Sequence, residues 1–265
     1  MQNVKRMQEK RRLIGRTTQL EGRTMTKTWK CPKVTVPDYF RDMTQREHIL
    51  IGGATGSGKS VALETFIFTL LEKAPHQAML VLIDPKGVEL IQFADMPHTL
   101  IHATEMEDIN KALLWMEREM DVRYERMAQK GQKKSEMGDI YIIIDEYACI
   151  GGKRGMASKS ALNALARIAF KGRASNIHIV ACTQRPTREV IDGLIADNFS
   201  TVLALRTKDS QGSRNLIGTK GCEDLPLYGK AYYDTPTAKG LQMVDVPKVS
   251  EEVMETMLNF WREQI

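Results

Sequence analysis

Short apolar segments alternate with helical patterns along most of the chain, and this alternation restricts the fold more than any other feature. Four of these segments have no polar alternation and predict buried strands: His48–Gly52, Ala78–Ile83, Tyr141–Ile144 and Ile177–Cys182. Strands that are buried on both faces are typical of parallel sheets with helices on each side. We therefore predict an α/β fold with a mainly parallel central sheet flanked by helices.

Weaker patterns complete the predicted domain. They predict strands at Thr99–His102 and Thr201–Leu205, a hairpin around Tyr228–Val244, and helices at Lys59–Lys73, Asp108–Gln129, Ser158–Phe170 and Ser250–Gln264. Gly131 and Gly172 are suited to end the second and third of these helices. We expect a basic arm or linker at residues 1–45 and one α/β domain at residues 46–265.

The positive charge is concentrated at the amino terminus. Residues 1–30 hold nine Lys or Arg residues against Glu9 and Glu21, which gives +7 and leaves −2 for the rest of the chain. Such an arm favours polyanions such as DNA, RNA or anionic lipid, although a solvated helix or a disordered tail is an equal alternative. The sequence contains no apolar run of 18 residues and no CxxC pair, so we expect no membrane span, no zinc site and a cytoplasmic location.

A glycine-rich loop lies between the first predicted strand and the first predicted helix. Its residues are Gly53, Ala54, Thr55, Gly56, Ser57, Gly58, Lys59 and Ser60, followed by Val61. They fit the GxxxxGK[ST] pattern, in which backbone N–H groups surround phosphates and the helix amino terminus adds positive potential. We expect Lys59 to reach the β- and γ-phosphates of ATP and Ser60 to bind Mg²⁺.

Two carboxylates end the apolar strand Tyr141–Ile144. Buried charge without a partner is costly, so Asp145 and Glu146 call for a functional explanation or for a helix N-cap. At the carboxyl end of a parallel strand, Asp145 would face the metal held by Ser60. Glu146 would then act as the general base that activates the attacking water.

Polar and basic residues near other predicted ends are further candidates. Thr183-Gln184-Arg185-Pro186 follows the strand Ile177–Cys182, and a polar side chain there could sense the γ-phosphate, although an ordinary strand-to-turn junction explains it as well. Arginines supplied by a neighbouring subunit complete many motor ATPases. Arg167, Arg173 and Arg206 lie near predicted element ends and are the candidates for that role.

Several segments beyond the two nucleotide motifs resemble the FtsK/SpoIIIE family of hexameric DNA translocases. The resemblance covers roughly residues 46–233 and rests on these stretches: Leu50–Leu63 (LIGGATGSGKSVAL), Ile83–Leu90 (IDPKGVEL), Pro97-His98, Ala112–Gly131 and Ile177–Leu194 with its TQRP sequence. It implies a RecA-like P-loop NTPase motor that forms a homo-hexameric ring around double-stranded DNA.

The resemblance also implies residue roles. The resemblance implies that Gln184 is a sensor of the γ-phosphate. It also implies that Arg173, within Lys171–Ala174, is the best candidate for an arginine finger. Lys153, Arg154 and Lys159 would form a pore loop that touches DNA phosphates, and Lys208 would do the same.

The large members of the family carry membrane helices, a linker, a preceding domain and a DNA-reading winged helix, and we expect none of these in this chain. We therefore interpret it as a minimal motor of a plasmid, phage or integrative element, used in DNA transfer with a membrane-bound or DNA-processing partner. The alternatives are a viral genome-packaging ATPase and a protein-transport motor of the type VII secretion kind. A binding module with an inactive nucleotide site is disfavoured, because Lys59, Ser60, Asp145 and Glu146 are all present.

Overall fold

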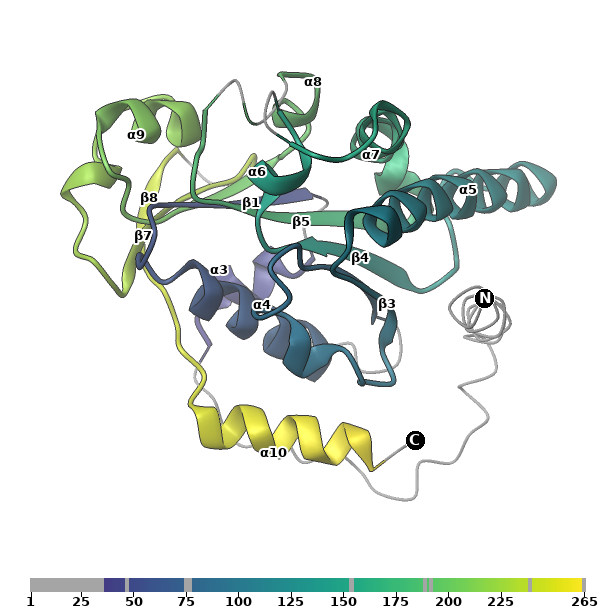
Figure 1. Cartoon of the computed structure of the whole chain (residues 1–265), viewed down its shortest axis with the longest axis horizontal. Helices are drawn as coiled ribbons and strands as arrows, with labels where there is room; N and C mark the ends of the chain where they lie inside the picture. Colours follow the sequence, from purple (N-terminus) through teal and green to yellow (C-terminus); the bar gives the residue numbers. More distant parts are fainter. Residues whose placement is uncertain are drawn as a thin grey trace.

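A central eight-stranded sheet organises the molecule (Figure 1). The computed structural model describes residues 36–45, 48–73, 78–152, 155–187, 190, 193–237 and 240–263. The strands are β1 (His48–Gly52), β2 (Ala78–Ile83), β3 (Thr99–Ala103), β4 (Asp139–Ile144), β5 (Ile177–Thr183), β6 (Thr201–Ala204), β7 (Lys230–Asp234) and β8 (Gln242–Asp245). Their order in the sheet is β3-β2-β4-β5-β1-β6-β7-β8.

The first six strands run parallel, and the last two add an antiparallel edge. Strands β1, β2 and β5 are buried along their whole length, which explains why their sequences are apolar without alternation. Because the six strands are parallel, all of them end at one edge of the sheet. We call this edge the carboxyl edge and the opposite one the amino edge.

Helices cover both faces of the sheet (Figure 1). One face carries α3 (Asp38–Met43), α4 (Lys59–Lys73) and α10 (Glu251–Arg262), and the other carries α5 (Met106–Lys130) and α7 (Lys159–Lys171). The short helices are α6 (Tyr147–Ile150), α8 (Gly193–Ala196) and α9 (Ser210–Ile217), with 3₁₀ turns η1 (Ile91–Phe93), η2 (Gly172–Ser175) and η3 (Cys222–Asp224). The predicted α/β architecture is confirmed. No helix in the described part of the chain is long and apolar enough to span a bilayer.

Local signals set the helix ends. The side chains of Ser158, Asp209 and Ser250 accept hydrogen bonds from backbone N–H groups in the first turns of α7, α9 and α10. Gly131 ends α5 in a left-handed conformation (φ 65°), as its position in the sequence predicts. The 3₁₀ turn η2 directly continues α7 and leads into β5.

Helix α3 lies within residues 1–45, which the sequence predicts to be a basic arm or linker. Its side chains Phe40 and Met43 are fully buried in the core beneath α4. The last part of that segment therefore packs as part of the domain. Residues 1–35, which hold the basic charge, lie outside the described residues.

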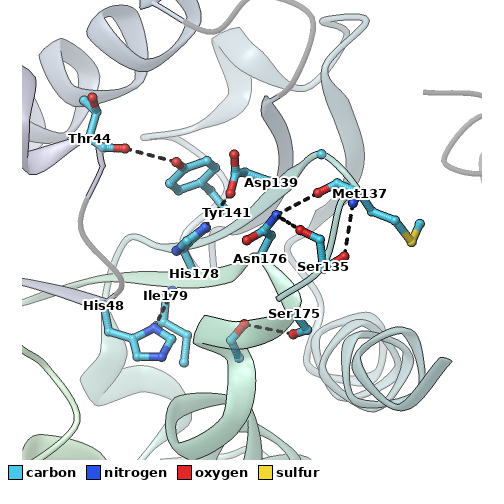
Figure 2. A network of polar contacts seen from close by, with 12 residues as sticks. Thr44, His48, Ser135, Met137, Asp139, Tyr141, Ser175, Asn176, His178 and Ile179 are labelled. Atoms are coloured by element: carbon cyan, nitrogen blue, oxygen red, sulfur yellow. Dashed lines mark hydrogen bonds and ion pairs between the residues drawn. The ribbon is translucent and has the colours of Figure 1, made fainter. Parts of the chain in front are cut away.

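The amino edge carries a dense polar network (Figure 2). Tyr141 donates its hydroxyl to Thr44 O at 3.0 Å and stacks on His178, whose Nε2 lies 2.8 Å from Asp139. Asn176, at a left-handed φ of 56°, donates to the carbonyl oxygens of Ser135 and Met137. These contacts join the beginnings of β4 and β5 to the loops beside them.

A buried arginine ties the long helix to this edge. Arg123 of α5 is almost fully buried and bonds Glu119 at 3.1 Å. Its Nη1 also donates to the carbonyl oxygens of Gly138, Ser175 and Asn176. One guanidinium therefore anchors α5 to the turn that includes η2.

Candidate nucleotide-binding site

The glycine-rich loop Gly53–Ser60 leaves β1 at the carboxyl edge and enters α4. Gly56 and Gly58 adopt φ values of 75° and 92°, which favour glycine. Neighbouring strands hold the base of the loop, because Gly53 N donates to Thr183 O and Ala54 N donates to Arg206 O. A Cβ at Gly53 would lie 2.6 Å from Ser57 Oγ, so the close packing there also requires glycine.

Lys59 folds back across this loop. Its Nζ donates to Ala54 O at 2.7 Å, and the side chain is nearly buried. Burial lowers the pKa of Lys59, while Glu146 and Asp145 are among the groups that act in the opposite direction. The ammonium group thus lies on the side of the loop that faces the two carboxylates.

Asp145 follows the last residue of β4 and is buried at the carboxyl edge. Within the described residues, its Oδ2 has no hydrogen-bond partner, and Lys86 Nζ lies 3.7 Å from it. Burial raises the pKa of Asp145 to about 6, and Lys86 partly opposes that shift. A buried carboxylate oxygen without a hydrogen bond is expensive unless it serves a ligand.

Glu146 is held by the tip of the neighbouring strand. Its carboxylate accepts hydrogen bonds from Gln184 N at 3.2 Å and from Ala148 N at 3.2 Å. The second contact caps α6. Glu146 is therefore a helix N-cap and at the same time lies close to the nucleotide loop. The side chain is fixed by backbone donors and lies beside Asp145.

Gln184 connects the two halves of the site. Strand β5 lies between β4 and β1 in the sheet, so the segment after it reaches both the carboxylates and the glycine-rich loop. Thr55 Oγ1 donates to Gln184 Oε1 at 2.6 Å, while Gln184 N donates to Glu146. Residues from three strand ends are therefore joined in one short chain of hydrogen bonds.

The residues present fit a magnesium ion. Asp145 offers a buried oxygen without a hydrogen bond, and Ser60 lies in the first turn of α4. The described residues contain no group of three or more His, Cys, Asp or Glu side chains arranged to hold a metal. Mg²⁺ commonly takes few protein ligands and completes its shell with phosphates and water, so a site of this kind is consistent with it.

The remaining predicted residues lie elsewhere. Arg173 is exposed on η2 at the amino edge, far from the loop. Lys159 begins α7 and Lys208 follows β6, and both are exposed near the carboxyl edge. Lys153 and Arg154 lie outside the described residues.

The structure adds two residues, Asp84 and Lys86, to which the sequence analysis assigned no role at the site. Lys86 pairs with Asp145, and Asp84 accepts backbone hydrogen bonds from Gly87 and Leu90 that shape the turn after β2. The sequence contains a pattern that could have indicated them: charged residues directly follow an apolar strand at Asp84-Pro85-Lys86, as they do at Asp145-Glu146. Only the pairing of β2 with β4 shows that the two strand ends are neighbours.

The fold and this site together define a RecA-like P-loop ATPase. Among solved structures, the pCW3 conjugation coupling protein TcpA has a TM-score of 0.70 at 23% identity, over 83% of this chain and 66% of that one. The type VII secretion ATPase EccC of Thermomonospora curvata has a TM-score of 0.68 at 22% identity, over 81% of this chain and 28% of that one. These likenesses support the fold.

Sequence comparison identifies the family. Residues 23–150 match the model of the FtsK/SpoIIIE family. The DNA translocase FtsK of Leptospira interrogans is 34% identical over 238 residues, which cover 82% of this chain and 25% of that protein. The FtsK of Helicobacter pylori is 33% identical over 241 residues, which cover 85% of this chain and 28% of that protein. The chain belongs to the FtsK/SpoIIIE family and spans about a quarter of the length of these relatives.

Proposed function

We propose that the chain hydrolyses ATP to move double-stranded DNA. The observation that carries the proposal is the meeting of Lys59, Asp145, Glu146 and Gln184 at one edge of the sheet, in a chain whose relatives at more than 30% identity are named DNA translocases. The loop supplies phosphate binding, and the carboxylates supply the groups that hydrolysis needs.

Each residue at this edge has a distinct role in the proposal. Backbone N–H groups of Gly53–Gly58 and the Lys59 ammonium hold the phosphates. Ser60 and Asp145 would hold Mg²⁺, which when bound neutralises phosphate charge. Glu146 accepts the proton of the attacking water, and the Gln184 side chain, now bonded to Thr55, orients that water or contacts the γ-phosphate.

Arg173 can complete only a neighbour's site. It precedes β5, whose seven residues span about 23 Å between the amino edge and Gln184. An arginine side chain does not bridge that distance within one subunit. We infer that Arg173 acts as an arginine finger across a subunit boundary, which requires an oligomer, and we propose that this oligomer is a homo-hexameric ring.

The nature of the cargo rests on the sequence relatives. The TM-scores of TcpA and EccC are nearly equal, so the fold does not separate a conjugation protein from a secretion ATPase. The closer sequence relatives are named for DNA, and the basic residues 1–30 suit a polyanion. We propose DNA contacts by the segment 153–159 and by Lys208, and a role in DNA transfer with a membrane-bound or DNA-processing partner.

The deciding measurement is ATP hydrolysis by the purified chain with and without linear duplex DNA, at low and moderate salt. We expect duplex DNA to stimulate turnover at least tenfold at low salt and less at moderate salt, because phosphate contacts weaken with salt. Lys59→Ala should remove the activity under all conditions. Turnover that is indifferent to DNA would contradict the DNA cargo, and full activity of Lys59→Ala would contradict the site.

A further inference from the structure

A tyrosine stands beside the glycine-rich loop on the side away from the carboxylates. Tyr228 lies in the turn before β7, which pairs antiparallel with β6. Tyr232 is paired with Ala204, the last residue of β6, so Tyr228 extends past the end of that strand at the carboxyl edge. Since β6 borders β1, this turn is next to the loop.

The ring of Tyr228 reaches the loop while most of it stays exposed. A Cβ placed on Gly58 would lie 3.9 Å from Tyr228 Cδ1 and 3.7 Å from Leu205 Cδ2. Leu205 is fully buried, whereas Tyr228 is 66% exposed. The preceding Leu227 is also exposed. An apolar surface is therefore open to solvent where the loop turns into α4.

The orientation of a bound nucleotide follows from the two sides of the loop. The groups suited to the γ-phosphate and to Mg²⁺ are Asp145, Glu146 and Gln184, which lie on the side of β4 and β5. The γ-phosphate end of a bound nucleotide therefore lies on the side of β4 and β5. The ribose and the base, at the other end of the nucleotide, then lie on the side of β6 and β7. Tyr228 stands on that side.

We propose that Tyr228 is the stacking platform for the nucleobase of the bound nucleotide. The inference rests on the proposed ATP site and adds to it the subsite for the base. Every base has a π face, and aromatic stacking tolerates changes in base identity. The site would therefore select the triphosphate strongly and the base weakly, with purines favoured for their larger stacking area.

Two exposed apolar side chains lie away from the glycine-rich loop. Phe170 lies at the end of α7 near the amino edge, and Met243 lies on the edge strand β8. Met243 therefore serves as a matched control for the removal of an exposed apolar side chain without a nucleotide beside it.

The test compares ligands with and without a base. Equilibrium binding of ATP and of inorganic tripolyphosphate, each with Mg²⁺, is measured for the wild-type chain, Tyr228→Ala, Tyr228→Phe and Met243→Ala. We expect Tyr228→Ala to raise the Kd for ATP about tenfold. The Kd for tripolyphosphate should stay unchanged, and the other two variants should match the wild-type chain.

Two results would overturn the inference. An unchanged Kd for ATP in Tyr228→Ala would show that the ring does not contact the base. An equal loss for ATP and tripolyphosphate would show that the ring supports the loop instead. The variant Lys59→Ala distinguishes failure of the Tyr228 inference from failure of the proposed function, because it should weaken the binding of both ATP and tripolyphosphate. Normal binding of both ligands by Lys59→Ala would contradict the proposed nucleotide site itself.

Discussion

The two edges of the sheet hold one buried carboxylate each in different ways: Glu119 is hydrogen-bonded by Arg123, whereas Asp145 keeps one oxygen without a hydrogen bond. At the amino edge, Arg123 pairs with the buried carboxylate of Glu119, and Figure 2 shows the contact of His178 with Asp139, although His48 Nε2 and Asn176 Oδ1 have no hydrogen-bond partner among the described residues. At the carboxyl edge, Asp145 keeps a buried oxygen without a hydrogen bond, and so does Ser57. A buried carboxylate that is hydrogen-bonded by a partner stabilises the fold, whereas a buried carboxylate oxygen that has no hydrogen bond and lies beside a phosphate loop is available to a ligand.

The difference predicts separate consequences for mutations at the two edges. Changes at the carboxyl edge should remove activity with little loss of stability. Changes at the amino edge should reduce the free energy of unfolding while the folded protein still binds nucleotide.

The largest expected effect is on catalysis, in Glu146→Gln. The glutamine oxygen can still accept the N–H groups of Gln184 and Ala148, so the cap of α6 should persist. We expect the ATPase rate to fall by about 10²- to 10⁴-fold because the general base is lost, with ATP binding and melting temperature retained. Steady-state hydrolysis and nucleotide binding measured on the same sample check this. Unchanged turnover would exclude Glu146 as the base, and a large drop in melting temperature would break the contrast between the edges.

The next effect is on stability, in Arg123→Met. The variant leaves Glu119 buried without its partner and removes the Arg123 donor from the carbonyl oxygens of Gly138 and Ser175, while Asn176 O keeps its hydrogen bond from Ile140 N. We expect the free energy of unfolding in urea to fall by about 3–5 kcal/mol. The matched control is Arg167→Met, which breaks exposed pairs with Glu117 and Asp121 and should cost less than about 1 kcal/mol. Equal losses in the two variants would show that the amino-edge network has no special role.

The smallest effect is a pH dependence caused by His48. Burial lowers the pKa of His48 to about 3, and the neighbouring His178 and Arg173 act in the same direction. Its Nδ1 accepts from Ile179 N at 3.0 Å, so the neutral form is the native one. The folded protein then binds fewer protons than the unfolded chain below pH 6.5, and stability is lost as the pH falls from there toward 3.

The measurement compares wild type with His48→Asn, whose side-chain oxygen can replace Nδ1 as the acceptor. The stability advantage of the wild-type chain over the variant should shrink by about 1.4 kcal/mol for each pH unit below 6.5. Parallel curves for the two proteins between pH 6.5 and 5 would show that His48 does not titrate in this way.

The regular elements of the parallel core were predictable because their signals are local. Strands β1 and β2 and helix α4 have the predicted ends, since each is an apolar run or an amphipathic stretch bounded by glycine, proline or charge. Helix α9 was not predicted, because Ser210–Ile217 is mostly polar and buries only Ser213 and Leu216. Its start depends on the Asp209 cap and its end on Gly218 in a left-handed conformation.

The sequence by itself determined where the glycine-rich loop and the two carboxylates lie. The spacing of Gly53–Ser60 and the position of Asp145-Glu146 after an apolar run predict a phosphate loop and two carboxylates at the same edge of a parallel sheet. The conformation of a loop and the ends of a strand depend on residues that are close in the sequence. Each segment can therefore be predicted without knowledge of the others.

Tertiary structure alone decided which strand ends are neighbours. Inserting β5 between β4 and β1 brings Gln184 to both Thr55 and Glu146, and pairing β2 with β4 brings Lys86 to Asp145. The turn before β7 places Tyr228 beside Gly58 in the same way. Strand order depends on how helices pack across both faces of the whole sheet, which no local pattern contains.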